Sequence, residues 1–157
     1  MMCFENIISL LNVTVPFITA VLLAWINNRT SKKQIQTDTL HKRFDEFYFP
    51  FYRNYISLNL CSKENELSHM DLEVIEEFTY LCTNNMYLMD SNSQKYVPNL
   101  YAAYLDLIEI KSDISTALDF EHPLLKAFDN IFNPLTNSVF EEYKCICNKL
   151  QLPKPAL

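Results

Sequence analysis

The sequence feature that most constrains this chain is an uncharged, mainly apolar run from Ile7 to Ile26. A helix of about 20 residues, rising 1.5 Å per residue, spans roughly 30 Å, the hydrocarbon thickness of a bilayer. The run IISLLNVTVPFITAVLLAWI has that length and therefore predicts a transmembrane helix. Pro16 and the polar residues Asn12 and Thr19 leave a buried core helix open as the alternative. In a membrane span, Pro16 favours a kink, and the polar side chains favour contacts between helices of a homo-oligomer.

The residues that flank the run predict its orientation. Residues 1–6 hold Glu5 and no Lys or Arg, and no small-residue cleavage pattern follows the run, which disfavours a cleaved signal peptide. The other end of the run carries residue types of the membrane interface: Trp25, Arg29, Lys32 and Lys33. By the positive-inside rule we expect a single-pass protein of the cell (inner) membrane, with the N-terminus outside and the C-terminal domain in the cytoplasm.

The complete absence of glycine narrows both fold and function. A chain of 157 residues at the usual share of about 7% would contain several glycines. Dinucleotide-binding turns, P-loops and nucleophile elbows need glycine for close approach of the backbone, so these sites are excluded. Type I′ and II′ hairpins and β-bulges also depend on glycine, whereas helices broken by the seven prolines do not. An all-α fold is therefore expected.

The net charge of −6 is unevenly distributed. Residues 1–43 hold five Lys and Arg against two acids, a net charge of +3, so the remainder of the chain carries −9. The basic part suits membrane lipid with anionic headgroups. The acidic remainder does not suit duplex nucleic acid, which is therefore not an expected partner.

Cysteines and histidines give little sign of a metal or cofactor. The five cysteines include a Cys145-x-Cys147 pair, but structural zinc sites use four ligands with wider, CxxC-like spacing. The histidines, His41, His69 and His122, are far apart in the sequence. We expect reduced thiols in the cytoplasm, no metal site and no cofactor. No nucleophile motif, HExxH motif or supported carboxylate pair is present either, so we expect no enzyme.

Apolar residues at helical spacing predict a cytosolic, antiparallel four-helix bundle with proline kinks after the membrane helix. Residues 27–39 are expected to form a basic juxtamembrane stalk, residues 40–152 the helical domain, and residues 153–157 a tail. The first helix extends to about Leu60, with Pro50 opening its second half.

The remaining helix starts are predicted from caps and prolines. Ser68 to Asp71 resembles a capping box, which places the start of the second helix there. The third helix is expected from about Val97 to Leu118, and Pro123 opens the last helix, which Pro134 should kink.

The segment from Arg43 to Ile56 has the densest aromatic content of the chain. Its simplest interpretation is a core-forming helix, because aromatic side chains bury the largest area per residue. Arginine within an apolar run nevertheless needs a carboxylate, an aromatic face or an anionic ligand. The candidate ligand- or partner-binding residues are therefore Arg43, Tyr48, Tyr52, Arg53 and Tyr55.

Two functions remain open at this stage. One is an oligomeric effector whose domain senses a small anionic ligand, such as a nucleotide, or a partner, and then acts at the membrane. Its layout is similar in kind to that of small membrane effectors of prokaryotic antiphage defence, although no sequence motif supports a family. The other is a passive membrane anchor or adaptor that docks a partner protein.

Overall fold

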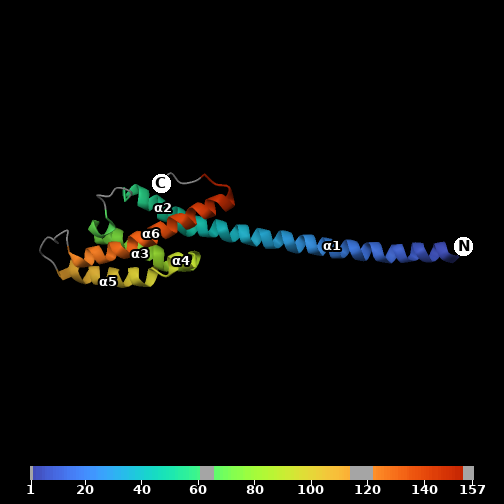
Figure 1. The fold of residues 1–157 in the computed structure, drawn as a ribbon, viewed down its shortest axis with the longest axis horizontal. Coiled ribbons are helices and arrows are strands. Elements are labelled where there is room, and N and C mark those ends of the chain that lie inside the picture. Colours follow the sequence, from blue (N-terminus) through green and yellow to red (C-terminus); the bar gives the residue numbers. More distant parts are fainter. Residues whose placement is uncertain (1, 61–65, 114–121, 154–157) are drawn as a thin grey trace. The chain divides into compact units, whose positions relative to one another are not determined.

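A computed structural model describes residues 2–60, 66–113 and 122–153 of the chain, with side chains described at residues 15–60, 66–109 and 122–153. By internal contacts the chain divides into two units, Met1–Thr39 and Leu40–Leu157. The helix α1, Met2–Arg43, begins in the first unit and ends in the second (Figure 1). The predicted start of the folded domain at residue 40 is the first residue of the second unit.

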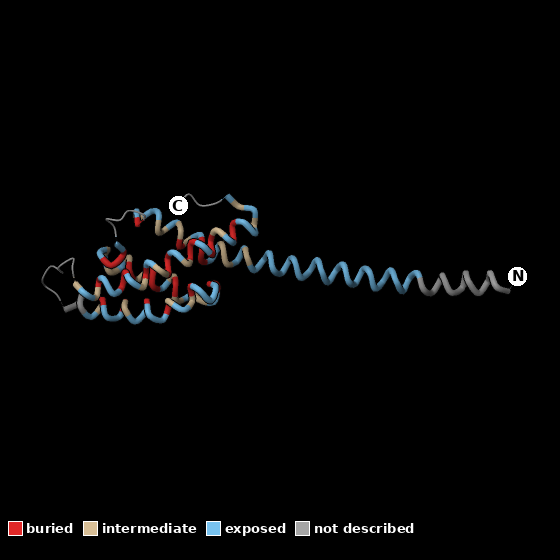
Figure 2. The backbone as a smooth tube through the Cα atoms, in the orientation of Figure 1, coloured by how far each residue is buried: buried red, intermediate tan, exposed pale blue. Residues whose placement is uncertain are grey.

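The first unit is a single helix whose side chains are exposed at every residue from 15 to 39 (Figure 2). Its threonine hydroxyls donate to carbonyls one turn back in the same helix, as Thr19 does to Val15 at 2.8 Å and Thr30 to Ile26 at 2.9 Å. These polar groups are therefore satisfied without water or a neighbouring chain.

Among the described residues, no helix has both the length and the apolarity needed to cross a membrane. The predicted span Ile7–Ile26 lies only partly within the side chains that the structure describes, because residues 7–14 are outside that set. The span therefore stays a prediction.

The second unit is built from helices alone in the part of the chain that the structure describes. After α1 they are, in order, the π-helix η1 (Phe44–Tyr48), α2 (Phe49–Ser57), the 3₁₀ turn η2 (Leu67–His69), α3 (Leu72–Asn84), the 3₁₀ turn η3 (Met86–Leu88), α4 (Ser91–Gln94), α5 (Val97–Asp113) and α6 (Pro123–Leu150). The prediction of an all-α chain containing a helical bundle is confirmed.

The long helix α6 is the centre of the bundle. It packs against η1, η2, α4 and α5, and α3 packs against α5. Neighbouring α5 and α6 run in opposite directions, since the end of α5 and the start of α6 lie at the same end of the bundle (Figure 1). Buried residues concentrate where these helices face one another (Figure 2).

Aromatic side chains form much of the core between α2, α3 and α6. Phe51 is fully buried, and its ring centroid lies 5.4 Å from that of Phe78, 6.3 Å from Phe132 and 6.0 Å from Phe140. Phe47, one turn before Phe51, is also fully buried. The interpretation of this aromatic segment as a core-forming helix is confirmed.

Proline sets several helix starts as predicted. Pro123 and Pro98 are the first and second residues of α6 and α5, where a missing N–H costs little, and Pro50 is the second residue of α2, which continues directly from η1. Before Pro50, the N–H of Phe49 donates to the carbonyl of Phe44, five residues back, so the chain passes the proline through a π turn without a loop. Pro134 lies inside α6 and does not end that helix.

The predicted capping box at Ser68 is wrong. The helix α3 begins at Leu72, after a 3₁₀ turn and two extended residues, and Asp71 stands before it without a side-chain cap. Ser68 is fully buried, and both its hydroxyl and its N–H donate to the carboxylate of Asp129 on α6. The residue that precedes α3 is therefore Asp71, and Ser68 lies in the 3₁₀ turn before it.

The aromatic core predicts a large cost for removing its central rings. Replacing a buried Phe with Ala typically costs about 3 to 5 kcal/mol, and a domain of this size is stable by roughly 5 to 15 kcal/mol. The Phe47→Ala/Phe51→Ala variant of the full chain should therefore lose cooperative thermal melting, measured by circular dichroism. Phe49→Ala is the matched control, since Phe49 is 44% exposed. Retained cooperative melting in the double variant would show that this face contributes little to the core.

Candidate functional site

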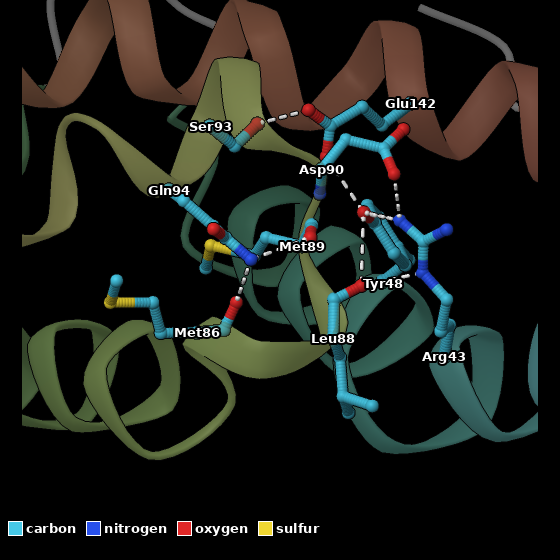
Figure 3. A network of polar contacts seen from close by, with 9 residues as sticks. All are labelled: Arg43, Tyr48, Met86, Leu88, Met89, Asp90, Ser93, Gln94 and Glu142. Carbon is cyan, nitrogen blue, oxygen red and sulfur yellow. Dashed lines mark hydrogen bonds and ion pairs between the residues drawn. The ribbon is translucent and has the colours of Figure 1, made fainter.

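A cluster of hydrogen-bonded polar side chains lies where α1 ends (Figure 3). Arg43, the last residue of α1, is half-buried, and its Nε donates to the carbonyl of Leu88. Its Nη2 donates to the hydroxyl of Tyr48 at 2.9 Å and to Oδ1 of Asp90 at 2.7 Å. The guanidinium also lies 5.5 Å from the centroid of the Tyr48 ring. The end of α1 is thereby bonded to η1 and to the segment between η3 and α4.

A buried carboxylate from α6 completes this cluster. Glu142 is only 7% exposed and accepts from the Tyr48 hydroxyl at 2.7 Å, the Ser93 hydroxyl at 2.7 Å and the N–H of Asp90 at 3.2 Å. These donors come from η1, from α4 and from the residue that precedes α4 (Figure 3). Three hydrogen bonds compensate the cost of removing a carboxylate from water.

The surroundings of Tyr48 and Arg43 keep both side chains protonated near neutral pH. Burial, with a further contribution from Glu142, raises the pKa of Tyr48, so its hydroxyl remains a donor. Burial alone would lower the pKa of Arg43, but the contacts with Tyr48 and Asp90 outweigh it and raise that pKa. One cation and two carboxylates give the cluster a net charge of −1, which does not favour binding of a further anion.

The segment between η3 and α4 is held by further side chains. Nε2 of Gln94 donates to the carbonyls of Met86 and Met89 at 3.1 and 3.0 Å (Figure 3). The Tyr87 hydroxyl donates to Glu46 at 3.3 Å, and the ammonium of Lys42 lies 5.6 Å from the Tyr87 ring centroid. The short turns around Leu88 are thus attached both to α1 and to η1.

The structure brings together two of the five candidate binding residues. Arg43 and Tyr48 are in contact within the cluster, whereas Arg53 is exposed on α2 and lies outside it. Tyr52 and Tyr55 are partly buried against α6, with ring centroids 6.2 and 4.9 Å from that of Phe140. These two tyrosines pack on the core on the α2 side.

Sequence reasoning missed Asp90, Ser93 and Glu142. Only Glu142 left a usable signal, because it stands three residues after Val139 and four before Ile146, at the spacing of the buried face of α6. A carboxylate at a core-facing position must find donors. Asp90 and Ser93 lie in a polar turn whose tertiary partners the sequence does not indicate.

The predicted interface residues of α1 are all exposed. The guanidinium of Arg29 lies 5.4 Å from the ring centroid of Trp25, one turn earlier, which makes a cation–π pair on the helix surface. Lys32 and Lys33 follow on the next turn. Trp25 and the three cations therefore share one short stretch of an exposed helix.

The described cysteines are free thiols. Cys82 and Cys147 are buried and Cys145 is exposed, while Cys3 and Cys61 lie outside the described side chains. Burial raises the pKa of both Cys82 and Cys147, which disfavours their reactive thiolate forms. Within the described residues, no group of three or more His, Cys, Asp or Glu side chains is placed to hold a metal ion.

A second buried carboxylate lies at the opposite end of α6. Asp129 is 5% exposed and accepts from the hydroxyl and the N–H of Ser68. Burial raises the pKa of Asp129 above its ordinary value of 3.8, although the hydrogen bonds from Ser68 act in the opposite direction. This residue attaches η2 to the bundle.

The cluster around Glu142 predicts unequal effects for two neighbouring substitutions. Glu142→Gln replaces one acceptor oxygen with an NH₂ group, which cannot accept from the hydroxyl groups of Tyr48 or Ser93. The free energy of unfolding should fall by about 1 to 3 kcal/mol. Glu141→Gln is the matched control, because the Glu141 side chain is 75% exposed and has only a surface ion pair with Lys144. Thermal melting should show a Tm lowered by at least about 4 °C for Glu142→Gln and little changed for Glu141→Gln. Equal Tm values would mean that Glu142 contributes no net stability.

The raised pKa of Asp129 predicts the sign of a pH effect. The folded state binds the Asp129 proton more tightly than the unfolded state does. The stabilisation that protonated Asp129 gives to the fold is therefore fully present below pH 3.8 and is lost as pH rises through the folded pKa. The free energy of unfolding of the wild type, minus that of Asp129→Asn, should therefore fall between pH 4 and pH 7. Urea denaturation at the two pH values measures it. A difference that increases with pH would show instead that the bonds from Ser68 stabilise the charged form.

Comparison of the chain with protein-family models, with curated proteins and with solved structures finds no significant match.

Proposed function

We propose that this chain is a non-catalytic, single-pass membrane protein whose cytosolic helical domain senses a ligand or partner and acts at the membrane through α1. The observation that carries the proposal is the apolar, exposed surface of α1. Its large apolar side chains between residues 15 and 26 are 49–70% exposed: Val15, Phe17, Ile18, Val21, Leu22, Leu23, Trp25 and Ile26. An exposed apolar surface of this extent needs a covering partner.

The distribution of these residues favours lipid as that partner. Successive residues of a helix are about 100° apart. Val15, Leu22 and Ile26 therefore lie on one side of α1, and Phe17 and Val21 lie on the opposite side. A helix that is apolar around most of its circumference is typical of a membrane span, whereas a helix that packs against one neighbour carries a single stripe. In the sequence, Ile7 to Leu11 extend the same composition toward the N-terminus.

The orientation follows from the cations that flank the run. Arg29, Lys32 and Lys33 follow it, and only Glu5 precedes it, so we place the folded domain in the cytoplasm. Cys145 is exposed and reports on this side. An impermeant maleimide should label Cys145 only after lysis, and labelling of Cys145 in intact cells would contradict the orientation.

The polar cluster supports an active role for α1. This helix is continuous from Met2 to Arg43, and Arg43 is bonded to Leu88, Tyr48 and Asp90. A ligand or partner that displaced the segment from Leu88 to Asp90 would change contacts of the last residue of the same helix. In this proposal, oligomers of the chain act as effectors of a prokaryotic defence or stress system, and the displacement is the signal.

A passive adaptor is the second candidate, because the bonding of Arg43 argues against an anionic ligand at this residue. Three of the five N–H groups of Arg43 are used within the fold, on Nε and Nη2. In a nucleotide site built on both Arg43 and Arg53, most N–H groups of Arg43 would therefore be unavailable to the ligand. Arg53 is exposed and remains the cation of α2 that an anionic ligand could reach.

Replacement of the apolar run separates these functions. In the test variant, residues 7–26 are exchanged for an unrelated apolar helix of equal length, and the control variant lacks them. Both the wild type and the exchanged variant should resist extraction by carbonate, and the deletion variant should not. Strong expression of an effector should make cells take up a membrane-impermeant dye, and the exchanged variant should fail to do so.

The outcomes distinguish the candidates. Extraction of the wild type by carbonate would overturn membrane anchoring. Dye uptake by the wild type alone supports the effector. If neither the wild type nor the exchanged variant causes dye uptake, the adaptor is the better proposal.

A further inference from the structure

The surface of α3 carries two adjoining grooves that the polar cluster does not use. The first has a volume of about 490 Å³ and is lined by Glu73, Glu76, Glu77, Tyr80 and Asn84, with residues of α2 and the end of α3. The second has a volume of about 410 Å³, and its apolar lining comes from Tyr80, Met86, Val97, Pro98 and Tyr101. Tyr80 and Asn84 line both grooves, so the two form one surface with an acidic half and an aromatic half.

The acidic half lacks a matching cation. Glu73 and Glu77 are exposed one turn apart on α3, and Glu76 lies between them, partly buried. Among the described residues no Lys, Arg or His forms an ion pair with these three carboxylates. Like charges one turn apart are unfavourable in a helix, and a bound cation would relieve their repulsion.

The aromatic half presents tyrosine rings to solvent. Tyr80 and Tyr101 are 41% and 40% exposed, and both contact the buried Tyr104, with ring centroids 6.1 and 6.3 Å from its own. Aromatic grooves of this kind bind proline and aliphatic side chains. Tyrosine faces beside carboxylates also attract ammonium and guanidinium groups.

We infer that this two-part groove binds an extended peptide segment of a partner protein, with a Lys or Arg in the acidic half and proline or aliphatic residues in the aromatic half. The acidic lining disfavours nucleic acid and anionic lipid headgroups. The grooves are open along the surface, whereas small-molecule sites enclose most of their ligand. If the proposed function holds, such a segment belongs to the partner that the sensor or adaptor engages. The binding itself does not depend on anchoring by α1.

A labelled peptide of matching chemistry tests this inference. The probe is fluorescein-PLPKPLPKPL, titrated by fluorescence anisotropy with the full chain in uncharged detergent at physiological salt. Two peptides serve as controls, one with Glu in place of each Lys and one with Ser in place of each Pro. The probe should bind saturably, the Glu peptide should not bind, and the Ser peptide should bind more weakly than the probe.

Matched protein variants locate the site. Tyr80→Ala should weaken binding at least about tenfold, because Tyr80 belongs to both halves, whereas Tyr87→Ala removes an exposed tyrosine that lines neither groove. Glu73→Gln/Glu77→Gln should weaken binding about three- to tenfold. Its control, Asp45→Asn/Glu141→Gln, makes the same change in net charge outside the grooves and should leave affinity within about twofold.

Three results would overturn the inference. They are no saturable binding by the wild type up to about 1 mM, equal binding of the Glu peptide, and equal weakening by groove and control variants. Thermal melting of each variant ensures that weaker binding does not reflect unfolding. Membrane fractionation is independent of this assay, so the docking site and the anchoring proposal can fail separately.

Discussion

The hydrogen bonds to Glu142 determine how the first part of the folded domain is held to the rest. A carboxylate that is 7% exposed is tolerated only if donors replace the water that it loses. Here the donors are Tyr48, Ser93 and Asp90. All three hydrogen bonds form only when η1, α4 and the residue before α4 are packed against α6. Arg43 then bonds to Tyr48 and Asp90, which brings the end of α1 into the same arrangement. Loss of any one element would leave a buried charge poorly compensated.

The absence of glycine has a visible cost at helix ends. Asn59, after α2, and Gln151, after α6, have φ of 54° and 57°, the left-handed conformation that glycine adopts most easily. For a residue with a Cβ, this conformation costs roughly 1 kcal/mol or more. At Gln151 it permits the N–H of Leu152 to bond to the carbonyl of Cys147 and so to satisfy the last turn of α6. The chain thus ends α2 and α6 with Asn and Gln in a conformation for which glycine is the usual residue.

The sequence predicted the helical class, the core face of the aromatic segment and the proline-marked helix starts, because each depends on local periodicity or local stereochemistry. It failed at Ser68, where the chain forms a 3₁₀ turn packed on Asp129 and α3 begins only at Leu72. It also missed the partners of Arg43. Asp90 is 47 residues from Arg43, and Glu142 is 94 residues from Tyr48, to which it is bonded, so no local pattern connects these residues.

Arg43 is satisfied inside the fold, whereas the carboxylates on the surface of α3 have no cation among the described residues. An arginine in an apolar segment must find acceptors, and Arg43 finds them inside the fold. The carboxylates Glu73 and Glu77 are in the opposite situation, because the described residues supply them with no cation. With a charge of −9 after residue 43, the folded domain is attracted to cations and repelled by an anionic leaflet. In the membrane-anchored state that we propose, this repulsion would leave the acidic groove of α3 available to basic segments of other proteins.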